Sequence, residues 1–404
     1  ALASVMWIFT VIYAFEYMKG KEHLNMFFAF FTAAYGATLG IAMSADLLTM
    51  YFFYEILTLV TLPLVIQPMT KKAIRAGRKY LYMSLGGSAF AFIGLVILIH
   101  QTGQAEFVSG GIYDNALDTT GLVAYLLTFL GFGVKSAVFP LHIWLPAASV
   151  APTPVTALLH AVAVVKSGVF AIIRVTYYCY GVEAIRGTWA QYTALIIAII
   201  TIVYGSAMAL RERHFKRRLA YSTVSNISYI VFGAMLLSEA GLAAALMHFL
   251  FHSVTKIAAF MNAGAVIETT EREYIFRLDG LGRKMPVTFG CFTVSALSLT
   301  GIPLFWGFFS KWNLCTAALA DGGAYGIVGV AALLISALFT AIYMFSIVIR
   351  AFFRQGEDLE DVHEANWRMS WIALPLALFM ALAFILMPQL SQYFNSIASA
   401  AFAA

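Results

Sequence analysis

Apolar residues run along this chain in twelve long blocks, separated by short polar stretches. A helix that spans a bilayer needs about 20 mainly apolar residues, and the blocks reach that length. No water reaches the backbone inside a bilayer, and the blocks are too long and continuous for barrel strands, so we expect each block to be mainly helical. Their approximate limits are 1–18, 26–44, 46–68, 79–100, 121–145, 151–180, 190–210, 219–238, 241–267, 286–316, 324–349 and 368–394. The pattern predicts an all-α polytopic membrane protein with about twelve transmembrane helices.

Composition supports this fold class. The chain is 61% hydrophobic and 11% charged, with a mean hydropathy of +0.84, which is typical of an integral membrane protein. It opens inside an apolar block at Ala1, without an initiator Met, so we expect further residues to precede it. Cys179, Cys291 and Cys315 are scattered and have no CxxC spacing, which favours small core residues over a disulfide framework or a metal site.

Basic residues gather in alternate connections between the blocks. The connections after the first, third, seventh, ninth and eleventh blocks hold most of the 25 Lys and Arg residues, whereas the others are mainly acidic. Because Lys and Arg accumulate on the cytoplasmic side of membrane proteins, we expect these five loops to be cytoplasmic and both ends of the chain to face outward. The net charge of +5 follows from these loops. It predicts a lipid bilayer as partner and no nucleic acid.

Four lysines and one glutamate lie inside the apolar blocks, away from the block ends. An ammonium at bilayer depth costs at least ~2.5–3.5 kcal/mol, so four of them call for a function. Glu55 lies in the third block and must be paired or protonated there. Its expected partner is Lys135, and the alternative is a static ion pair that fixes helix packing. The lysines are Lys135, Lys166, Lys256 and Lys311.

Two of the blocks are interrupted by helix-breaking residues. Pro140 breaks the fifth block just after Lys135, and Gly301 with Pro303 breaks the tenth block before Lys311. Two breaks that lie five spans apart have opposite orientations, which suggests inverted repeats. The expected organisation has four parts: a first helix and loop, the first repeat, the second repeat, and a loop with a final helix. These parts cover 1–25, 26–180, 190–350 and 351–404.

The ninth block carries a stripe of titratable residues. His248, His252 and Lys256 follow one another at i, i+4 intervals and therefore share one helix face. Imidazole exchanges protons near neutral pH, so we interpret the stripe as a hydrated proton wire. His160, six residues before Lys166, is expected to extend this line toward Lys135. An HxxxH pair also suits a metal, but no acidic or Cys third ligand is near in sequence, so no metal or cofactor is predicted.

Long motifs resemble one protein family. The run KSAVFPLHIWLPAASVAPTPVTALLHAVAVVKSGVF, from Lys135 to Phe170, is similar to the signature of the antiporter-like subunits shared by respiratory complex I, membrane-bound hydrogenases and multisubunit Na+/H+ antiporters. Further matches are FFYEI around Glu55, KRRLAYSTVSNISYI, HFLFHSVTKIAAF and LSLTGIPLFWGFFSKW. The similarity covers essentially the whole chain. It implies a core of fourteen helices, of which this sequence lacks the first two.

The resemblance also implies roles for individual residues. Glu55 and Lys135 would form a modulating pair, Lys166 the central relay and Lys311 the exchange site toward the opposite half-channel, with His248, His252 and Lys256 linking them. Two positions depart from the family pattern: His214 replaces a usual acidic residue, and Asn226 replaces a frequent His. We expect the route near Asn226 to rely on water and on nearby serines.

The predicted function is proton translocation by a membrane subunit of a multisubunit energy-converting complex. The chain has no nucleotide, flavin, haem or iron–sulfur motif. The energy must therefore come from a redox partner or a counter-ion gradient, and whether the complex is an enzyme stays open. Expected partners are other membrane subunits, including homologous antiporter-like ones, in a bacterial, archaeal or organellar inner membrane. Alternatives are a Na+/H+ antiporter subunit, a proton-coupled subunit of an inorganic-carbon uptake system, and a purely structural subunit.

Overall fold

The computed structural model describes residues 1–113, 116–320 and 323–403, and all regular elements within these ranges are helical. Two isolated backbone bridges join Asp46 to Glu106 and His214 to Tyr274. The elements are α1 (Leu2–Tyr17), α2 (Leu24–Met43), α3 (Leu47–Ile66), α4 (Lys71–Thr102), α5 (Thr119–Lys135), η1 (Leu141–Ile143), α6 (Trp144–Ala148), α7 (Thr153–Ala161), α8 (Val164–Val175), η2 (Thr176–Tyr180), α9 (Val182–Ile185), α10 (Trp189–Arg211), α11 (Phe215–Met235), α12 (Glu239–Thr270), η3 (Ile275–Arg277), α13 (Leu281–Lys284), α14 (Pro286–Thr300), α15 (Trp306–Ala320), α16 (Ala324–Phe353), α17 (Trp367–Ser370), α18 (Ala373–Leu382), η4 (Ala383–Leu386) and α19 (Met387–Phe402). The predicted all-α membrane fold is confirmed.

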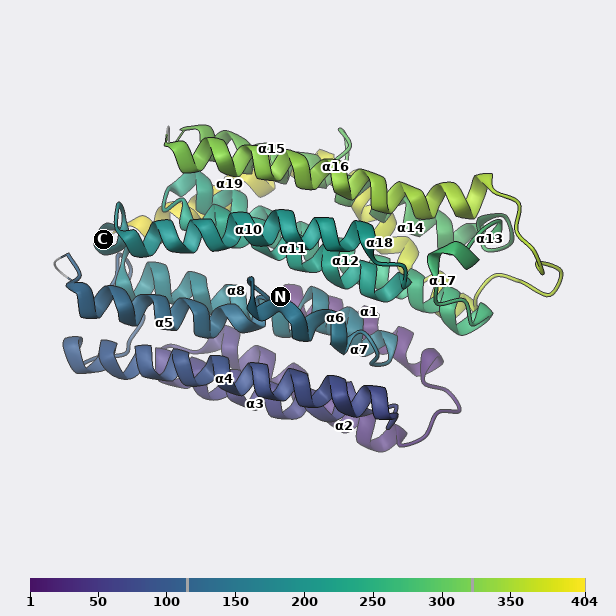
Figure 1. Cartoon of the computed structure of the whole chain (residues 1–404), viewed down its shortest axis with the longest axis horizontal. Coiled ribbons are helices and arrows are strands. Elements are labelled where there is room, and N and C mark those ends of the chain that lie inside the picture. The colour runs from purple at the N-terminus through teal and green to yellow at the C-terminus, as the bar shows by residue number, and fades with distance from the viewer. Residues whose placement is uncertain (114–115, 321–322, 404) are drawn as a thin grey trace.

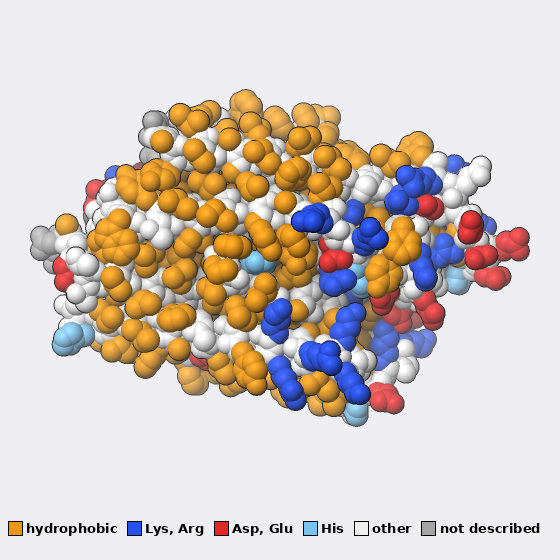
Figure 2. All heavy atoms as spheres, viewed as in Figure 1, with side chains coloured by type: hydrophobic (Ala, Val, Ile, Leu, Met, Phe, Trp, Pro, Cys, Tyr) orange, Lys and Arg blue, Asp and Glu red, His pale blue; other side chains and the backbone are white. Residues whose placement is uncertain are grey.

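The long helices lie side by side along the longest axis of the molecule (Figure 1). The connections that follow α1, α3, α10, α12 and α16 lie together at the right-hand end of this view. Figure 2 shows Lys and Arg side chains gathered toward the same end, while apolar side chains cover much of the rest of the face. We call this end the basic end. The positive-inside rule predicts that this end lies on the cytoplasmic side.

Four helices form the enclosed centre of the bundle. Nearly all side chains of α7, α8, α11 and the middle of α12 are buried. α12 packs against α7, α11, α14 and α15. The surrounding helices expose large apolar side chains such as Leu59, Leu334 and Leu338, as expected for a surface that faces lipid. Polar residues on α12 therefore face other helices and not lipid.

The two predicted helix breaks are present. α5 ends at Lys135, and the chain turns through Pro140 into η1 and α6. α14 ends at Thr300, the next residue Gly301 has φ +87, and α15 begins at Trp306. Proline has no N–H to donate and glycine adopts positive φ without strain, so both residues suit the non-helical stretches between these helices.

A third break was not predicted. The sixth block is divided between α7 and α8 at Val162 and Ala163, although neither residue is Gly or Pro. The amides of both residues donate to the carbonyl of Leu158, at 3.0 and 2.8 Å. The next helix therefore starts afresh at Val164, three residues before Ser167.

Two further boundaries differ from the expected ones. α4 begins at Lys71 instead of residue 79, because Thr70 accepts from the amide of Ala73 and caps the helix. Several basic residues of the third connection therefore lie on a helix. The last block is divided among α17, α18, η4 and α19.

The two halves of the bundle share a packing order. α2, α3, α4 and α5 contact one another in sequence, and α10, α11, α12 and α14 do the same. This order agrees with the two repeats expected from the sequence. Their inverted relation and their boundaries stay a prediction.

Candidate functional site

The structure places the Lys135 ammonium against α3. Its Nζ donates to the carbonyl of Tyr54 and lies 3.3 Å from the centroid of the Tyr54 ring. The neighbouring Glu55 carboxylate accepts a hydrogen bond from the Ser88 hydroxyl of α4. Within the described part of the chain, Glu55 forms no ion pair within 4.0 Å. The expected direct contact between Glu55 and Lys135 is thus absent, although Lys135 binds the residue that precedes Glu55.

Lys166 lies near the start of α8 and points at α12. Its Nζ donates to the carbonyl of Phe249 at 3.0 Å and lies 4.1 Å from the centroid of the Phe249 ring. The side chain is 2% exposed and lines a cavity of about 210 Å³ with Thr38, Ser167 and Phe170. The break between α7 and α8 is what positions Lys166 in the first turn of a new helix.

His160 lies on α7, before that break. Its ring stacks on the ring of Phe260 of α12, with 4.8 Å between the centroids. Both of its ring nitrogens are buried and lack a hydrogen-bond partner among the described residues. Buried polar atoms of this kind are usually satisfied by internal water.

The stripe on α12 faces α11 and α15. His248 and His252 have ring centroids 6.3 Å apart. The Nδ1 of His248 lies 3.0 Å from the Ser310 hydroxyl of α15. Lys256 donates to the Ser222 hydroxyl and, at 3.2 Å, to the carbonyl of Leu219. The stripe therefore contacts both neighbouring helices through polar groups.

Lys311 binds the backbone that is freed by the second break. Its Nζ donates to the carbonyls of Leu299 and Thr300 at 2.5 and 3.0 Å. These carbonyls belong to the last turn of α14, where no further helical amide is available to bind them. The helix break thus supplies the oxygens that hold this ammonium.

The four buried lysines share one chemical environment. Each is at most 9% exposed, and each donates to a main-chain carbonyl. In the ranges that the structure describes, none of the four lies within 4.0 Å of a carboxylate. These lysines are held by neutral dipoles instead of fixed counter-ions.

Several polar residues of the site were missed by the sequence reasoning. Ser88, Ser310 and the carbonyls of Tyr54 and Phe249 are direct partners of predicted residues. Ser310 directly precedes Lys311, which is the one signal that could have found it. Ser222 was expected on the route near Asn226, and the Asn226 amide donates to its carbonyl at 2.8 Å.

The described residues contain no group of three or more His, Cys, Asp or Glu side chains that could hold a metal ion.

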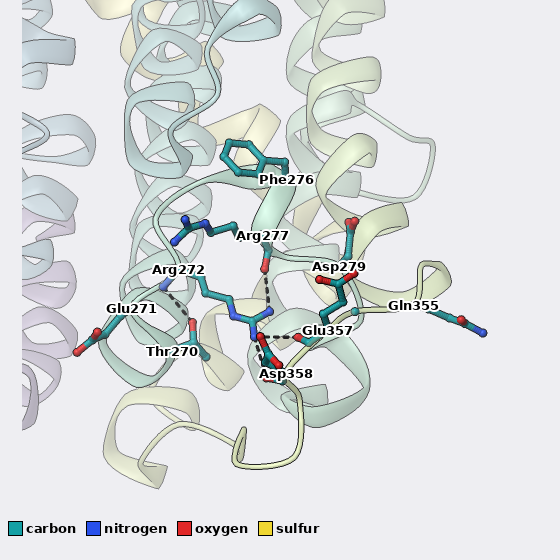
Figure 3. A pocket seen from close by; sticks show the side chains of 10 residues that line it. Thr270, Glu271, Arg272, Phe276, Arg277, Asp279, Gln355, Glu357 and Asp358 are labelled. Carbon is teal, nitrogen blue, oxygen red and sulfur yellow. Dashed lines mark hydrogen bonds between the residues drawn. The ribbon is translucent and has the colours of Figure 1, made fainter.

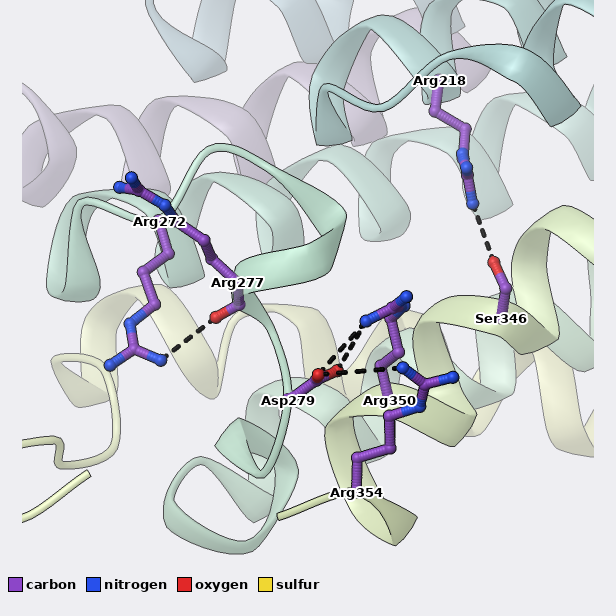
Figure 4. Close-up of polar contacts among 7 residues, drawn as sticks. All are labelled: Arg218, Arg272, Arg277, Asp279, Ser346, Arg350 and Arg354. Carbon is purple, nitrogen blue, oxygen red and sulfur yellow. Dashed lines mark hydrogen bonds and ion pairs between the residues drawn. The ribbon is translucent and has the colours of Figure 1, made fainter. Parts of the chain in front are cut away.

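The basic end is fixed by a second set of polar contacts, away from the lysines. Asp279 pairs with Arg350 at 3.0 Å and with Arg354 at 3.9 Å, and Arg218 donates to Ser346 at 2.8 Å (Figure 4). These contacts join the start of α11 and the loop before α13 to the end of α16.

A hollow of about 740 Å³ lies beside these contacts (Figure 3). There Arg272 donates to the carbonyls of Arg277, Glu357 and Asp358, at 3.1, 3.1 and 2.8 Å. The loop after α16 is therefore tied to the loop after α12.

His214 is the residue that departs from the family pattern at this end. Its Nε2 lies 3.3 Å from the Glu273 carboxylate, and its ring packs edge-on against Tyr274. Burial lowers the pKa of His214 to about 4, with the Glu273 carboxylate opposing and Arg217 and Lys216 adding to the shift. His214 is therefore neutral at physiological pH.

The fold and the buried polar axis define an integral membrane protein of the antiporter-like class. A sequence model of the family described as "NADH:quinone oxidoreductase/Mrp antiporter, TM" matches residues 44–340, and the chain belongs to this family. The expected family resemblance is confirmed.

Individual relatives come from several kinds of complex. The chain is 33% identical to the NADH-quinone oxidoreductase subunit N of Desulforudis audaxviator, over 87% of this chain and 70% of that protein. It is 28% identical to a Na(+)/H(+) antiporter subunit of Alkalihalophilus pseudofirmus, over 95% of this chain and 77% of that protein. Against chloroplastic NAD(P)H-quinone oxidoreductase subunit 5 of Glycine max it is 31% identical and spans 49% of that longer protein.

Solved structures agree with this assignment. A chain of the archaeal membrane-bound sulfane sulfur reductase superimposes with a TM-score of 0.90 at 25% identity, over 99% of this chain and 81% of that one. A chain of the Mrp complex from Dietzia sp. has the same fold, with a TM-score of 0.86 at 21% identity, over 99% of this chain and 84% of that one. This protein is an antiporter-like membrane subunit.

Proposed function

We propose that this subunit moves protons across the membrane along its buried polar axis. The axis begins at Glu55 and Lys135 on one side of the bundle and ends at Lys311 on the other. Between them the proton passes His160, Lys166 and the stripe on α12. The residues of the axis are Glu55, Lys135, His160, Lys166, His248, His252, Lys256 and Lys311.

One observation carries this proposal: the four buried lysines bind carbonyl oxygens, and none of them pairs with a carboxylate of the described residues. A fixed counter-ion would hold the proton on a lysine, because separating a buried ion pair is costly. A lysine that is held by neutral dipoles can exchange its proton without leaving an unpaired carboxylate behind. A static structural role would favour the opposite arrangement.

The geometry around α12 supports a continuous relay. Lys166 binds the carbonyl of Phe249, and the adjacent residue His248 contacts Ser310, which precedes Lys311. The central and the terminal lysine thus approach the same turn of α12 from two sides. His252 and Lys256 continue the stripe on α12 along the following turns.

Energy for uphill transport must come from outside this chain. Moving one charge against the membrane potential requires ~2.3 kcal/mol per 100 mV. The relatives are named as subunits of quinone oxidoreductases and of a Na(+)/H(+) antiporter. By extension, this chain works inside a multisubunit membrane complex, beside homologous antiporter-like subunits, and a partner's change in charge or shape alters the environment of Glu55 and Lys135.

A Na+/H+ antiporter subunit is the second candidate, favoured by the 28% identity to such a protein. Sodium prefers several oxygen ligands, and an anionic site draws it into a membrane. The axis offers the single carboxylate of Glu55 beside four ammonium groups, which repel a cation. We therefore assign H+ and not Na+ as the ion that this chain carries.

The test is a Lys166→Ala variant in the complete native complex, reconstituted in vesicles with a pH-sensitive dye inside. We expect proton translocation to be lost while the complex still assembles. Lys71→Ala is the matched control, since Lys71 is an exposed lysine at the start of α4. Undiminished translocation by Lys166→Ala would refute the proposed path.

A further inference from the structure

The groove between α14 and α18 is an apolar hollow that no residue of the proton axis lines. It has a volume of about 400 Å³. α14 packs against α18 along this groove. Its walls are apolar or lack a side chain, and they include Val287, Gly290, Val294, Trp371, Leu378 and Ala381.

The dimensions of the groove fit a hydrocarbon chain. From Pro286 to Val294 a helix rises about 12 Å, which is most of one leaflet of a bilayer with a core of ~30 Å. A groove of this length, with a volume of about 400 Å³ and apolar walls, suits an extended hydrocarbon chain.

The groove opens at the basic end of the bundle. Pro286 is the first residue of α14, and Arg283 and Lys284 lie directly before it on α13. Both side chains are exposed, and within the described ranges neither has a carboxylate within 4.0 Å. Trp371, 59% exposed, lines the opposite wall, and tryptophan is typical of the level of the lipid headgroups.

Glu364, an acidic residue beside the start of α14, is engaged by the helix itself. The Glu364 carboxylate accepts from the amide of Val287 at 2.8 Å and from the Thr288 hydroxyl, so it caps the start of α14. Arg368 already contacts Glu16 at 3.4 Å. The Arg283 Nε donates to the carbonyl of Phe352 at 3.1 Å, so the exposed donors beside the start of α14 are the other N–H groups of Arg283 and the Lys284 ammonium.

We propose that this groove binds one acyl chain of an anionic phospholipid of the cytoplasmic leaflet, with the lipid phosphate at Arg283 and Lys284. The apolar walls bury the hydrocarbon and the two cations select the charge of the headgroup. Gly290 leaves open space on the floor of the groove, since no atom lies within 4 Å of a Cβ added there. A larger side chain at this position would occupy the place of the acyl chain.

The experiment equilibrates the purified native complex with mixed vesicles of phosphatidylglycerol and phosphatidylcholine that have identical acyl chains, and then counts retained lipids by native mass spectrometry. We expect one phosphatidylglycerol to be retained by the unaltered protein and lost in Gly290→Leu. Gly86→Leu is the control, because Gly86 of α4 also has open space around it. It should retain the lipid.

Charge selection is tested separately. A basic residue near an anionic surface contributes about a fivefold preference, so Lys284→Gln should lower the preference for phosphatidylglycerol by about that factor, whereas Lys71→Gln should not. If Gly290→Leu does not assemble, Ala381→Leu tests the same space from the other wall. Retention that is equal for both lipids, or unchanged after filling the groove, would overturn the proposal.

Discussion

The Nδ1 of His248 and the hydroxyl of Ser310 lie 3.0 Å apart and join α12 to α15 inside the bundle. Ser310 also donates to the carbonyl of Gly307 at 3.2 Å. A hydroxyl can donate one proton and accept another, so it suits a relay between a ring nitrogen and the adjacent Lys311. This contact joins the stripe on α12 to α15, the helix that carries Lys311.

Removing that hydroxyl should slow proton transfer without changing assembly. A net hydrogen bond contributes about 1 kcal/mol, so Ser310→Ala should lower the translocation rate about fivefold, as measured by dye acidification in vesicles. Ser295→Ala is the control, because Ser295 of α14 is equally buried but donates only to the carbonyl of Cys291. An equal loss in both variants would mean that the effect is structural.

Glu55 should act through its charge. Glu55→Gln keeps a hydrogen-bond acceptor for Ser88 but removes the negative charge beside Lys135. We expect slower translocation with little change in thermal stability. Ser88→Ala should do the opposite: it should lower the thermal stability more than it lowers the rate of proton translocation. If Glu55→Gln pumps at the normal rate, the modulating role of Glu55 is wrong.

The close approach at the second helix break should be sensitive to a single methyl group. A Cβ added at Gly307 would overlap the carbonyl oxygen of Ser298, so α14 and α15 would have to separate. Gly307→Ala should lower the free energy of unfolding by about 1–3 kcal/mol in a detergent melt. Gly36→Ala should leave it unchanged or raise it, since nothing lies within 4 Å of that position.

His214 should make the stability of the basic end depend on pH. Its pKa is lowered to about 4 by burial, below the ordinary value of 6.5, so the unfolded chain binds a proton that the folded chain does not. Stability is therefore full above pH 6.5 and falls as the pH drops toward 4.

Substitutions at and around His214 test this pH dependence. His214→Asn should flatten the stability curve between pH 6.5 and 4, and His23→Asn, an exposed histidine at the same end, should not. Glu273→Gln removes the carboxylate that opposes the shift, so the fall should extend to lower pH. If the stability of His214→Asn falls with pH as steeply as that of the unaltered protein, the pH dependence comes from other groups.

The main features of the fold could be predicted from the sequence because lipid imposes simple rules. Twenty apolar residues require a helix at bilayer depth, and basic loops mark one end. The breaks at Pro140 and Gly301 could be predicted because proline and glycine are unfavourable inside a helix. The break at Val162 and Ala163 could not, since neither residue disfavours a helix by its type and only the hydrogen bonds of both amides to Leu158 reveal it.

The site residues were identifiable because charged residues inside apolar blocks stand out. Their contacts were not, because the partners are backbone carbonyls from other helices, which have no signature in a sequence. Lys135 illustrates the limit: charge alone suggested Glu55 as its partner, whereas its ammonium binds the carbonyl of Tyr54.

The central claim is that the buried lysines carry protons in series, and a double-variant cycle tests it most directly. Proton translocation by the native complex in vesicles is measured for Lys166→Met, Lys311→Met and the combination, at equal protein content. Steps in series predict that the double variant is no slower than the slower single variant, since one blocked step already stops the path. If the two single losses of rate multiply in the double variant, the lysines do not act in series. Rates equal to that of the unaltered protein would also contradict this claim.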